Sequence, residues 1–204
     1  MKKLNYFLTL LACATLVLSS CKKDEPEPQN ESELITFVEL TITREGFPDD
    51  IKIITATANQ SIGTGGNVTI TPTSLELLAD ASYTIEVTGL EDRSKTPVED
   101  ILEEVKEEAD EHQFYFDFSS TVLFTDLEYL DDDGNGQPLG TFVRVTTAAN
   151  PVTNSNFTIK LIHEGDKSLN IPATPWTLPD GNGGETDFTL TFPISLAAAP
   201  SAGR

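Results

Sequence analysis

Short stretches in which apolar and polar residues alternate dominate the chain from residue 34 onward. Successive side chains of a β-strand point to opposite faces, so a period of two predicts strands that bury one face. In the last stretch Phe188, Leu190, Phe192 and Ile194 share one face, and Asp187, Thr189, Thr191 and Ser195 share the other. One dry face and one wet face are typical of antiparallel sheets.

Nine stretches of this kind predict nine strands, at residues 34–42, 51–57, 68–71, 83–87, 114–118, 122–129, 142–147, 157–162 and 188–194. Two sheets that each bury one face pack together as a sandwich. The sequence therefore predicts a mainly β fold, an antiparallel β-sandwich of the Ig/cadherin kind, in one domain spanning residues 34–196. Pro193 has no backbone N–H to donate, which predicts that the last strand lies at a sheet edge.

A single amphipathic helix is predicted over about residues 97–112. Thr96 and Glu99 form a capping box, with Pro97 at the first helical position. Apolar residues then recur at helical spacing, and most of the remaining residues are acidic. The apolar stripe consists of Val98, Ile101, Leu102, Val105 and Ala109. We expect the stripe to pack on the sandwich while the acidic side of the helix faces solvent.

Residues 1–20 predict a bacterial lipoprotein signal peptide. Lys2 and Lys3 precede an apolar run over residues 4–18, which is too short to span a bilayer comfortably. The following Leu-Ser-Ser-Cys resembles the lipobox of bacterial lipoproteins. That resemblance implies cleavage before Cys21, a diacylglycerol on its sulfur and acylation of the new N-terminus, with palmitate as the expected acyl group; Cys13 leaves with the signal peptide. The alternative is an ordinary secretory signal with a chance cysteine.

Residues 21–33 predict an acidic, proline-containing tether. Beyond the cysteine this segment has no apolar side chain except two prolines, so it cannot form a core. Lysine followed by acidic residues just after the cysteine also resembles the surface-export signal of Bacteroidota lipoproteins. We therefore expect a lipid anchor in the outer membrane with the domain at the cell surface; the alternative is the periplasmic face. Residues 197–204 predict a disordered tail.

The acidic composition excludes several classes of function. With 13 Lys and Arg against 33 Asp and Glu, the formal net charge is −20, which excludes nucleic-acid binding and polybasic membrane binding. Two cysteines cannot build a zinc ribbon or an iron–sulfur site. The chain has no G-x-S-x-G motif, and nothing selects one carboxylate pair for glycoside hydrolysis. We therefore expect a protein that is not an enzyme.

Two histidines and their acidic neighbours form a candidate metal site. His112 is expected in the last turn of the helix, one turn after Glu108, and His163 ends a strand just before Glu164 and Asp166. If the helix end lies over the strand end, two imidazoles and a carboxylate can hold a divalent zinc or copper ion. The alternative is structural: one histidine interacts with the helix dipole, and the other caps hydrogen bonds at its strand end.

A glycine-rich acidic segment is a weaker candidate, for calcium. Asp131, Asp133 and Asn135, followed by Gly136, match the first half of a calcium loop. The twelfth position, where such a loop has glutamate, is Phe142. Asp-Gly and Asn-Gly pairs between alternating stretches are also typical of hairpin turns. The hairpin interpretation is favoured, and weak calcium binding could coexist with it.

The only tryptophan, Trp176, lies in a long connection over residues 172–184. An exposed tryptophan on the rim of a sandwich could stack on a sugar ring, whereas a buried one would close the open end of the core. The second interpretation is favoured.

Three segments suggest a family. The runs at residues 103–115, 163–167 and 183–187 together resemble a family of uncharacterised Bacteroidota surface lipoproteins, sometimes labelled "type 1 periplasmic binding fold superfamily". This family has no established activity, so the resemblance implies no catalytic residues. The label itself implies two lobes of alternating strands and helices, which one helix among nine predicted strands cannot form.

We therefore expect a lipid-anchored cell-envelope protein that captures a ligand or a metal ion, with an outer-membrane transporter or a small ligand as its partner. A purely structural or interaction role is the alternative, and a hydrolase with a carboxylate-based site is the third. The distance between the two histidines discriminates among these roles. Beyond about 12 Å the two imidazoles could not share one metal ion, because metal–nitrogen bonds are only about 2 Å long.

Overall fold

The alternating stretches form two β-sheets in the computed structural model of the chain, which describes residues 33–118, 123–168 and 183–199. These residues are mainly β, with eleven strands and one helix. All nine predicted strands are present. The two additional strands, β4 and β6, are too short to show a clear alternation.

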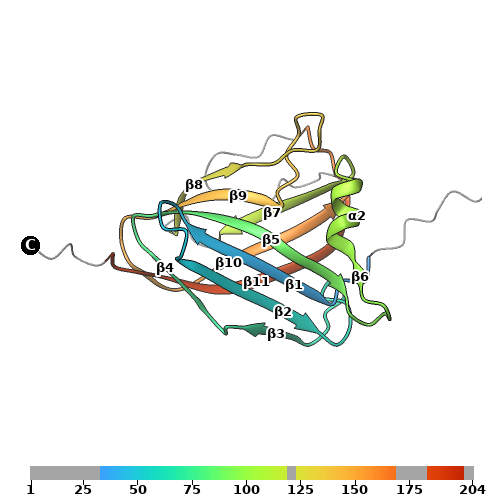
Figure 1. The fold of residues 1–204 in the computed structure, drawn as a ribbon, viewed down its shortest axis with the longest axis horizontal. Helices are drawn as coiled ribbons and strands as arrows, with labels where there is room; N and C mark the ends of the chain where they lie inside the picture. The colour runs from blue at the N-terminus through green and yellow to red at the C-terminus, as the bar shows by residue number, and fades with distance from the viewer. Residues whose placement is uncertain (1–32, 119–122, 169–182, 200–204) are drawn as a thin grey trace, which may run out of the picture. The chain divides into compact units, whose positions relative to one another are not determined.

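The larger sheet has the strand order β3-β2-β1-β5-β9-β8, with β6 paired to β5 (Figure 1). Its strands are β1 Phe37–Arg44, β2 Ile51–Ala58, β3 Val68–Thr71, β5 Ser82–Asp92, β6 Glu99–Asp100, β8 Phe124–Tyr129 and β9 Phe142–Thr147. The smaller sheet has the order β4-β11-β10-β7. Its strands are β4 Leu75–Leu78, β7 His112–Phe118, β10 Val152–His163 and β11 Glu185–Ala197.

One apolar core joins the two sheets. It takes buried side chains from the larger sheet, such as Leu40 and Val143, and from the smaller sheet, such as Phe114 and Phe192. The Phe192 ring stacks on that of Phe157, with 5.1 Å between the ring centroids. Two sheets that share one core form the predicted β-sandwich-like arrangement.

The expectation that all strands pair antiparallel is wrong for β4, which pairs parallel to β11. The predicted edge position of the last strand is also wrong, because β11 lies between β4 and β10. Pro193 is nevertheless accommodated: it lies opposite Asn156 of β10, and pairing with β4 begins only at Ile194. At Pro193 the strand therefore still has a paired neighbour on one side alone.

The helix, α2, is shorter than predicted and covers Ile101–Glu107 instead of residues 97–112. It begins late because Glu99 and Asp100 pair with the end of β5 as the short strand β6. The Asp100 side chain then accepts a hydrogen bond from the backbone N–H of Glu103, so Asp100 is the N-cap. Val98, which was expected in the apolar stripe, is outside the helix and 52% exposed.

The C-terminal end of the helix was also predicted wrongly. Glu108 is the C-cap, and His112 is the first residue of β7 instead of a residue of the last helical turn. The buried face of α2 consists of Ile101, Leu102 and Val105, as the spacing predicted. The helix thus packs through this face and leads directly into a strand of the smaller sheet.

Several predicted features lie outside the described residues: the signal peptide over 1–20, Cys21 and the tether as far as residue 32, Trp176, and residues 200–204 of the tail. They stay predictions. In the part of the chain that the structure describes, no helix is long and apolar enough to cross a membrane.

Candidate metal centre

His112 and His163 lie opposite each other at the same end of the smaller sheet. His112 begins β7, His163 ends β10, and the antiparallel register pairs them directly. Directly opposite residues of neighbouring strands point to the same face. The two imidazoles stack, with 4.3 Å between the ring centroids and 21° between the ring planes. They are therefore close enough to bind one cation.

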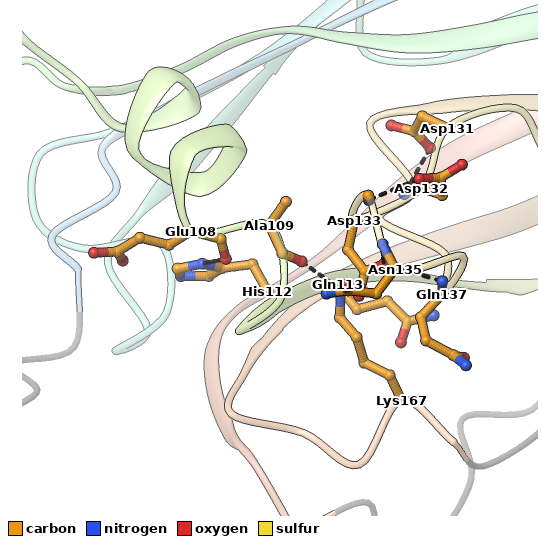
Figure 2. Close-up of polar contacts among 12 residues, drawn as sticks. Glu108, Ala109, His112, Gln113, Asp131, Asp132, Asp133, Asn135, Gln137 and Lys167 are labelled. Atoms are coloured by element: carbon orange, nitrogen blue, oxygen red, sulfur yellow. Dashed lines mark hydrogen bonds and ion pairs between the residues drawn. The ribbon is translucent and has the colours of Figure 1, made fainter.

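The turn that joins α2 to β7 holds the imidazole of His112. The carbonyl oxygen of Glu108 accepts hydrogen bonds from the backbone N–H groups of Glu111 and His112, at 3.0 and 3.2 Å. The same oxygen lies 3.1 Å from His112 Nδ1. Figure 2 shows this contact at the point where the helix ends. His112 therefore occupies a fixed position although it is not part of the helix.

This contact determines which ring nitrogen of His112 can bind a metal. A carbonyl oxygen only accepts hydrogen bonds, so in the neutral imidazole Nδ1 carries the proton and Nε2 keeps its lone pair. Metal-binding histidines commonly donate their other ring N–H to a backbone carbonyl in this way. His112 is fully buried, and its Nε2 lies 3.5 Å from Oε1 of Glu33.

Exposed carboxylates flank the two buried histidines. One possible ligand atom each of Glu108, His112 and His163 lie within 4.8 Å of one another, and the same holds for Glu111, His163 and Glu164. His163 belongs to both groups, and its Nε2 lies 3.3 Å from Oε2 of Glu111. Because the glutamates are exposed, a cation can approach from solvent and reach the imidazoles behind them.

Four of the five residues predicted for the metal site belong to one or the other of these two groups, and Asp166 belongs to neither. Its carboxylate accepts hydrogen bonds from the hydroxyl and the backbone N–H of Ser168, at 2.6 and 2.9 Å. These hydrogen bonds lower the pKa of Asp166 below its usual value. Asp166 belongs to neither group of neighbouring ligand atoms.

Sequence reasoning missed Asp187, which was expected on the solvent face of the last strand. Asp187 is only 4% exposed. The reason is a β-bulge: Leu161 pairs with Phe188 but Ile162 pairs with Thr186, so Asp187 is the extra residue between them. A bulge changes the direction of a side chain locally. No pattern with a period of two reveals such an irregularity.

Glu33 and Glu111 were also missed as members of the site. Glu33 was assigned to the tether on composition, yet its side chain is 10% exposed and lies beside His112. Glu111 follows from the turn geometry, because its carbonyl oxygen accepts a hydrogen bond from the backbone N–H of Glu164 at 2.7 Å. The available indication was only that acidic residues are frequent around His112.

The electrostatics of the site favour positive charge. Burial, together with the nearby charge of Glu33, raises the pKa of Asp187 to about 6, although the two histidines oppose this shift. Burial alone would lower the pKa of His112. The Glu33 carboxylate, the Glu108 carbonyl oxygen and the charge of Asp187 outweigh burial, so this pKa is raised above its usual value.

Lys167 contacts the turn between α2 and His112. Its ammonium donates a hydrogen bond to the carbonyl oxygen of Ala109 and lies 3.4 Å from Oδ2 of Asp133 (Figure 2). The Lys167 side chain is only 7% exposed. Burial lowers its pKa, and the carboxylate of Asp133 opposes that shift. Lys167 therefore connects the end of α2 with the loop between β8 and β9.

The segment proposed for calcium is the connection of a β-hairpin, since β8 and β9 pair antiparallel. The Asp131 carboxylate accepts hydrogen bonds from the backbone N–H of Gly140 and Phe142 and from the hydroxyl of Thr141, at 2.5–3.1 Å. Oδ1 of Asp133 accepts two more, from the backbone N–H groups of Asn135 and Gln137. These carboxylates are thus bound by donors of their own loop, which agrees with the favoured hairpin interpretation.

The chain matches no protein-family model, no curated protein and no solved structure. The resemblance to Bacteroidota lipoproteins stays a prediction that rests on the three sequence segments quoted above.

Proposed function

We propose that this protein captures a divalent transition-metal ion, zinc or copper(II), between His112 and His163. The observation that carries the proposal is the stacked pair of buried imidazoles with the Glu108 carboxylate beside them. Imidazole and carboxylate together are a donor set that suits both metals. The two rings stack 4.3 Å apart, and each neutral imidazole keeps one nitrogen lone pair that can bind a cation.

Capture of an ion fits the site better than capture of a larger molecule. A cavity of about 530 Å³ is lined by Arg44, Phe47 and Leu78, among others. These residues lie where β1 and β4 end, whereas the histidines lie beside α2, at the opposite end of the two sheets (Figure 1). A bare cation needs only the space between its ligand atoms.

We also propose that the protein is attached to the outer membrane. Lipidation of Cys21 would anchor the chain in the outer membrane, and the acidic tether would separate the folded domain from the lipid surface. A captured ion would then be available to a transporter in the same membrane. Mass spectrometry of the purified protein should find acyl groups on residue 21. Cys21→Ala should abolish this modification and move the protein from the membrane fraction to the soluble fraction.

Isothermal titration calorimetry of the purified full chain tests metal capture. Zinc or copper(II) should bind with a dissociation constant at or below the micromolar range, and His112→Ala should remove the heat of binding. Glu107→Gln is the matched control, because Glu107 is exposed on α2 next to Glu108 but belongs to neither ligand group. A wild-type chain that binds neither metal would contradict the proposal and favour a structural role in the envelope.

A further inference from the structure

A second group of possible ligand atoms adjoins the one that carries the proposed function. In this outer group, one ligand atom each of Glu111, His163 and Glu164 lie within 4.8 Å of one another. Oε2 of Glu111 is 3.3 Å from Nε2 of His163. The outer group has two exposed carboxylates and one buried imidazole, whereas the inner group, Glu108, His112 and His163, has one exposed carboxylate and two buried imidazoles.

The backbone fixes the two segments that carry the outer carboxylates. The carbonyl oxygen of Glu111 accepts a hydrogen bond from the backbone N–H of Glu164, at 2.7 Å. Glu164 has a φ of +53°, in the left-handed region that residues with a Cβ rarely adopt. Such a conformation persists only where the surrounding structure holds it. The end of β10 is therefore held against the turn that precedes β7.

The carboxylates of both groups lack a basic partner other than histidine. Among the residues that the structure describes, no lysine or arginine forms a salt bridge with Glu108, Glu111 or Glu164. In the hairpin loop, by contrast, Lys167 pairs with Asp133. Carboxylates that gather without lysine or arginine attract cations from solvent.

The inner group contains an unsatisfied nitrogen. Nε2 of His112 is buried and has no hydrogen-bond partner, and His112 is fully buried. The carboxylate of Glu33 lies 3.5 Å from this nitrogen, but an ionised carboxylate has no proton to donate. The lone pair of Nε2 is thus free for a cation, while Nδ1 faces the carbonyl oxygen of Glu108. His112 stacks on His163, which belongs to both groups.

We propose that the outer group is the entry position of the metal site: a divalent cation binds there first and then passes to the inner group. This inference rests on the proposed function. In the transfer, the bonds from the cation to Glu111 and Glu164 break and bonds to Glu108 and His112 form, while His163 is a ligand in both positions. The step exchanges ligands only, so it needs no oxidant, reductant or other reactant.

The two donor sets suit this order. At the exposed outer group a cation keeps part of its water shell, which lowers the cost of taking the ion out of water in a single step. The inner group adds a second imidazole, a ligand that suits zinc and copper(II), whereas carboxylate and water suit calcium and magnesium. The inner position therefore selects zinc or copper(II) among the cations that reach the outer one.

The release rate of zinc tests the entry position. The zinc-loaded full chain is mixed with an excess of a fluorescent zinc indicator, and the release rate and the dissociation constant are measured. A cation that enters through the outer group also leaves through it. The Glu111→Gln/Glu164→Gln double variant should therefore release zinc at least about 10-fold more slowly, while its dissociation constant rises less than about 5-fold.

Slower release is specific to the loss of a path, because the loss of a ligand or of an attractive charge speeds release. Glu107→Gln is the matched control: Glu107 is exposed on α2 and belongs to neither group, so the release rate should not change. Unchanged or faster release in the double variant refutes the entry position while metal capture stands. If the wild-type chain binds no metal, both proposals fail.

A second measurement detects the entry position if the double variant does not fold. His112→Ala disables the inner group, and manganese(II), which suits carboxylate ligands, is added in millimolar excess. It should broaden the NMR signals of the backbone amides of residues 111 and 164. Adding Glu164→Gln to the same chain should reduce this broadening, and adding Glu107→Gln should not. Without broadening at these amides, the outer group binds no cation and the proposal is overturned.

Discussion

Two acidic regions of this molecule differ in whether their carboxylate oxygens accept hydrogen bonds. In the loop between β8 and β9, Asp131 accepts three hydrogen bonds from neighbouring backbone and hydroxyl groups. Beside the histidine pair, Glu33 and Asp187 each keep a buried oxygen without a hydrogen-bond partner. Both regions look like cation sites in the sequence, yet only the second has oxygens that its own fold does not satisfy.

The difference shows how an acidic chain can be searched for cation sites. The number of neighbouring carboxylates says little in a protein with 33 acidic residues. A buried carboxylate oxygen without a donor is costly to the fold unless a proton or a cation compensates for it. The predictions below test this distinction through metal binding and through stability.

The largest expected effect is on zinc binding. His163→Ala removes an imidazole that belongs to both ligand groups, and zinc affinity should fall at least about 100-fold, which is about 2.7 kcal/mol. Asp133→Asn in the hairpin loop removes the ion pair with Lys167 and should lower zinc affinity no more than a few-fold. Calorimetric titration of the two variants, with circular dichroism to confirm folding, measures both effects. Weaker zinc binding in Asp133→Asn than in His163→Ala would reverse the comparison.

The second prediction concerns the contribution of the loop between β8 and β9 to the free energy of unfolding. Asp131→Ala removes three hydrogen bonds to one carboxylate and leaves their donors unpaired. Hydrogen bonds to a charged group contribute about 1.5–3 kcal/mol each, and losses of neighbouring bonds are not additive, so we expect about 3 kcal/mol of destabilisation. Urea unfolding with and without zinc should give the same loss, because this loop acts on the fold alone. A loss that disappears when zinc is added would assign a metal to the loop.

In the absence of metal, Asp187→Asn should stabilise the folded protein, whereas Asp131→Ala should destabilise it. The folded protein holds the pKa of Asp187 at about 6, above its value of 3.8 in the unfolded chain, so folding favours the protonated form. The carboxyl group therefore costs no stability below about pH 4, and its cost grows between pH 4 and 6 and is complete above. At pH 8 the variant should be more stable than the wild-type protein by about 2–3 kcal/mol.

Thermal unfolding in the presence of a chelator, at pH 4 and at pH 8, checks this prediction. His112 changes stability in the same direction, since its raised pKa gives stability that is lost as the pH rises through that pKa. Glu185→Gln serves as the control on the same strand. A metal-free Asp187→Asn variant that is less stable than wild type at pH 8 would show that this carboxylate supports the fold, as Asp131 does.

The fold was predictable where local pattern determines structure. Nine strands follow from alternation, because a side chain's face depends only on its own position along the strand. The start of α2 was not predictable, since Glu99 and Asp100 pair with β5, a contact that no local rule contains. The parallel pairing of β4 was missed for the same reason: four residues carry too little pattern, and their partner lies more than a hundred positions away.

The candidate site was predictable only in part. His112 and His163 were recognisable because both lie at the ends of elements beside acidic residues, but their contact depends on the register between β7 and β10. That register brings two residues 51 positions apart into direct opposition. Asp187 faces inward because of a bulge, and Glu33 was hidden by the composition of the segment before it. The positions of the site residues thus depend on a β-bulge and on strand pairing between distant segments, which a local sequence pattern does not contain.

The smallest expected effect concerns Lys167, which touches both regions. Its ammonium bonds to the carbonyl oxygen of Ala109 beside the histidines and pairs with Asp133 of the hairpin loop. Lys167→Met keeps the length of the side chain but removes both contacts, which should cost about 1–2 kcal/mol of stability. Because the turn that carries Glu108 is then held less firmly, zinc affinity should also fall a few-fold. Lys167→Arg should restore part of both losses, whereas unchanged zinc affinity in a destabilised Lys167→Met would show that the two regions are independent.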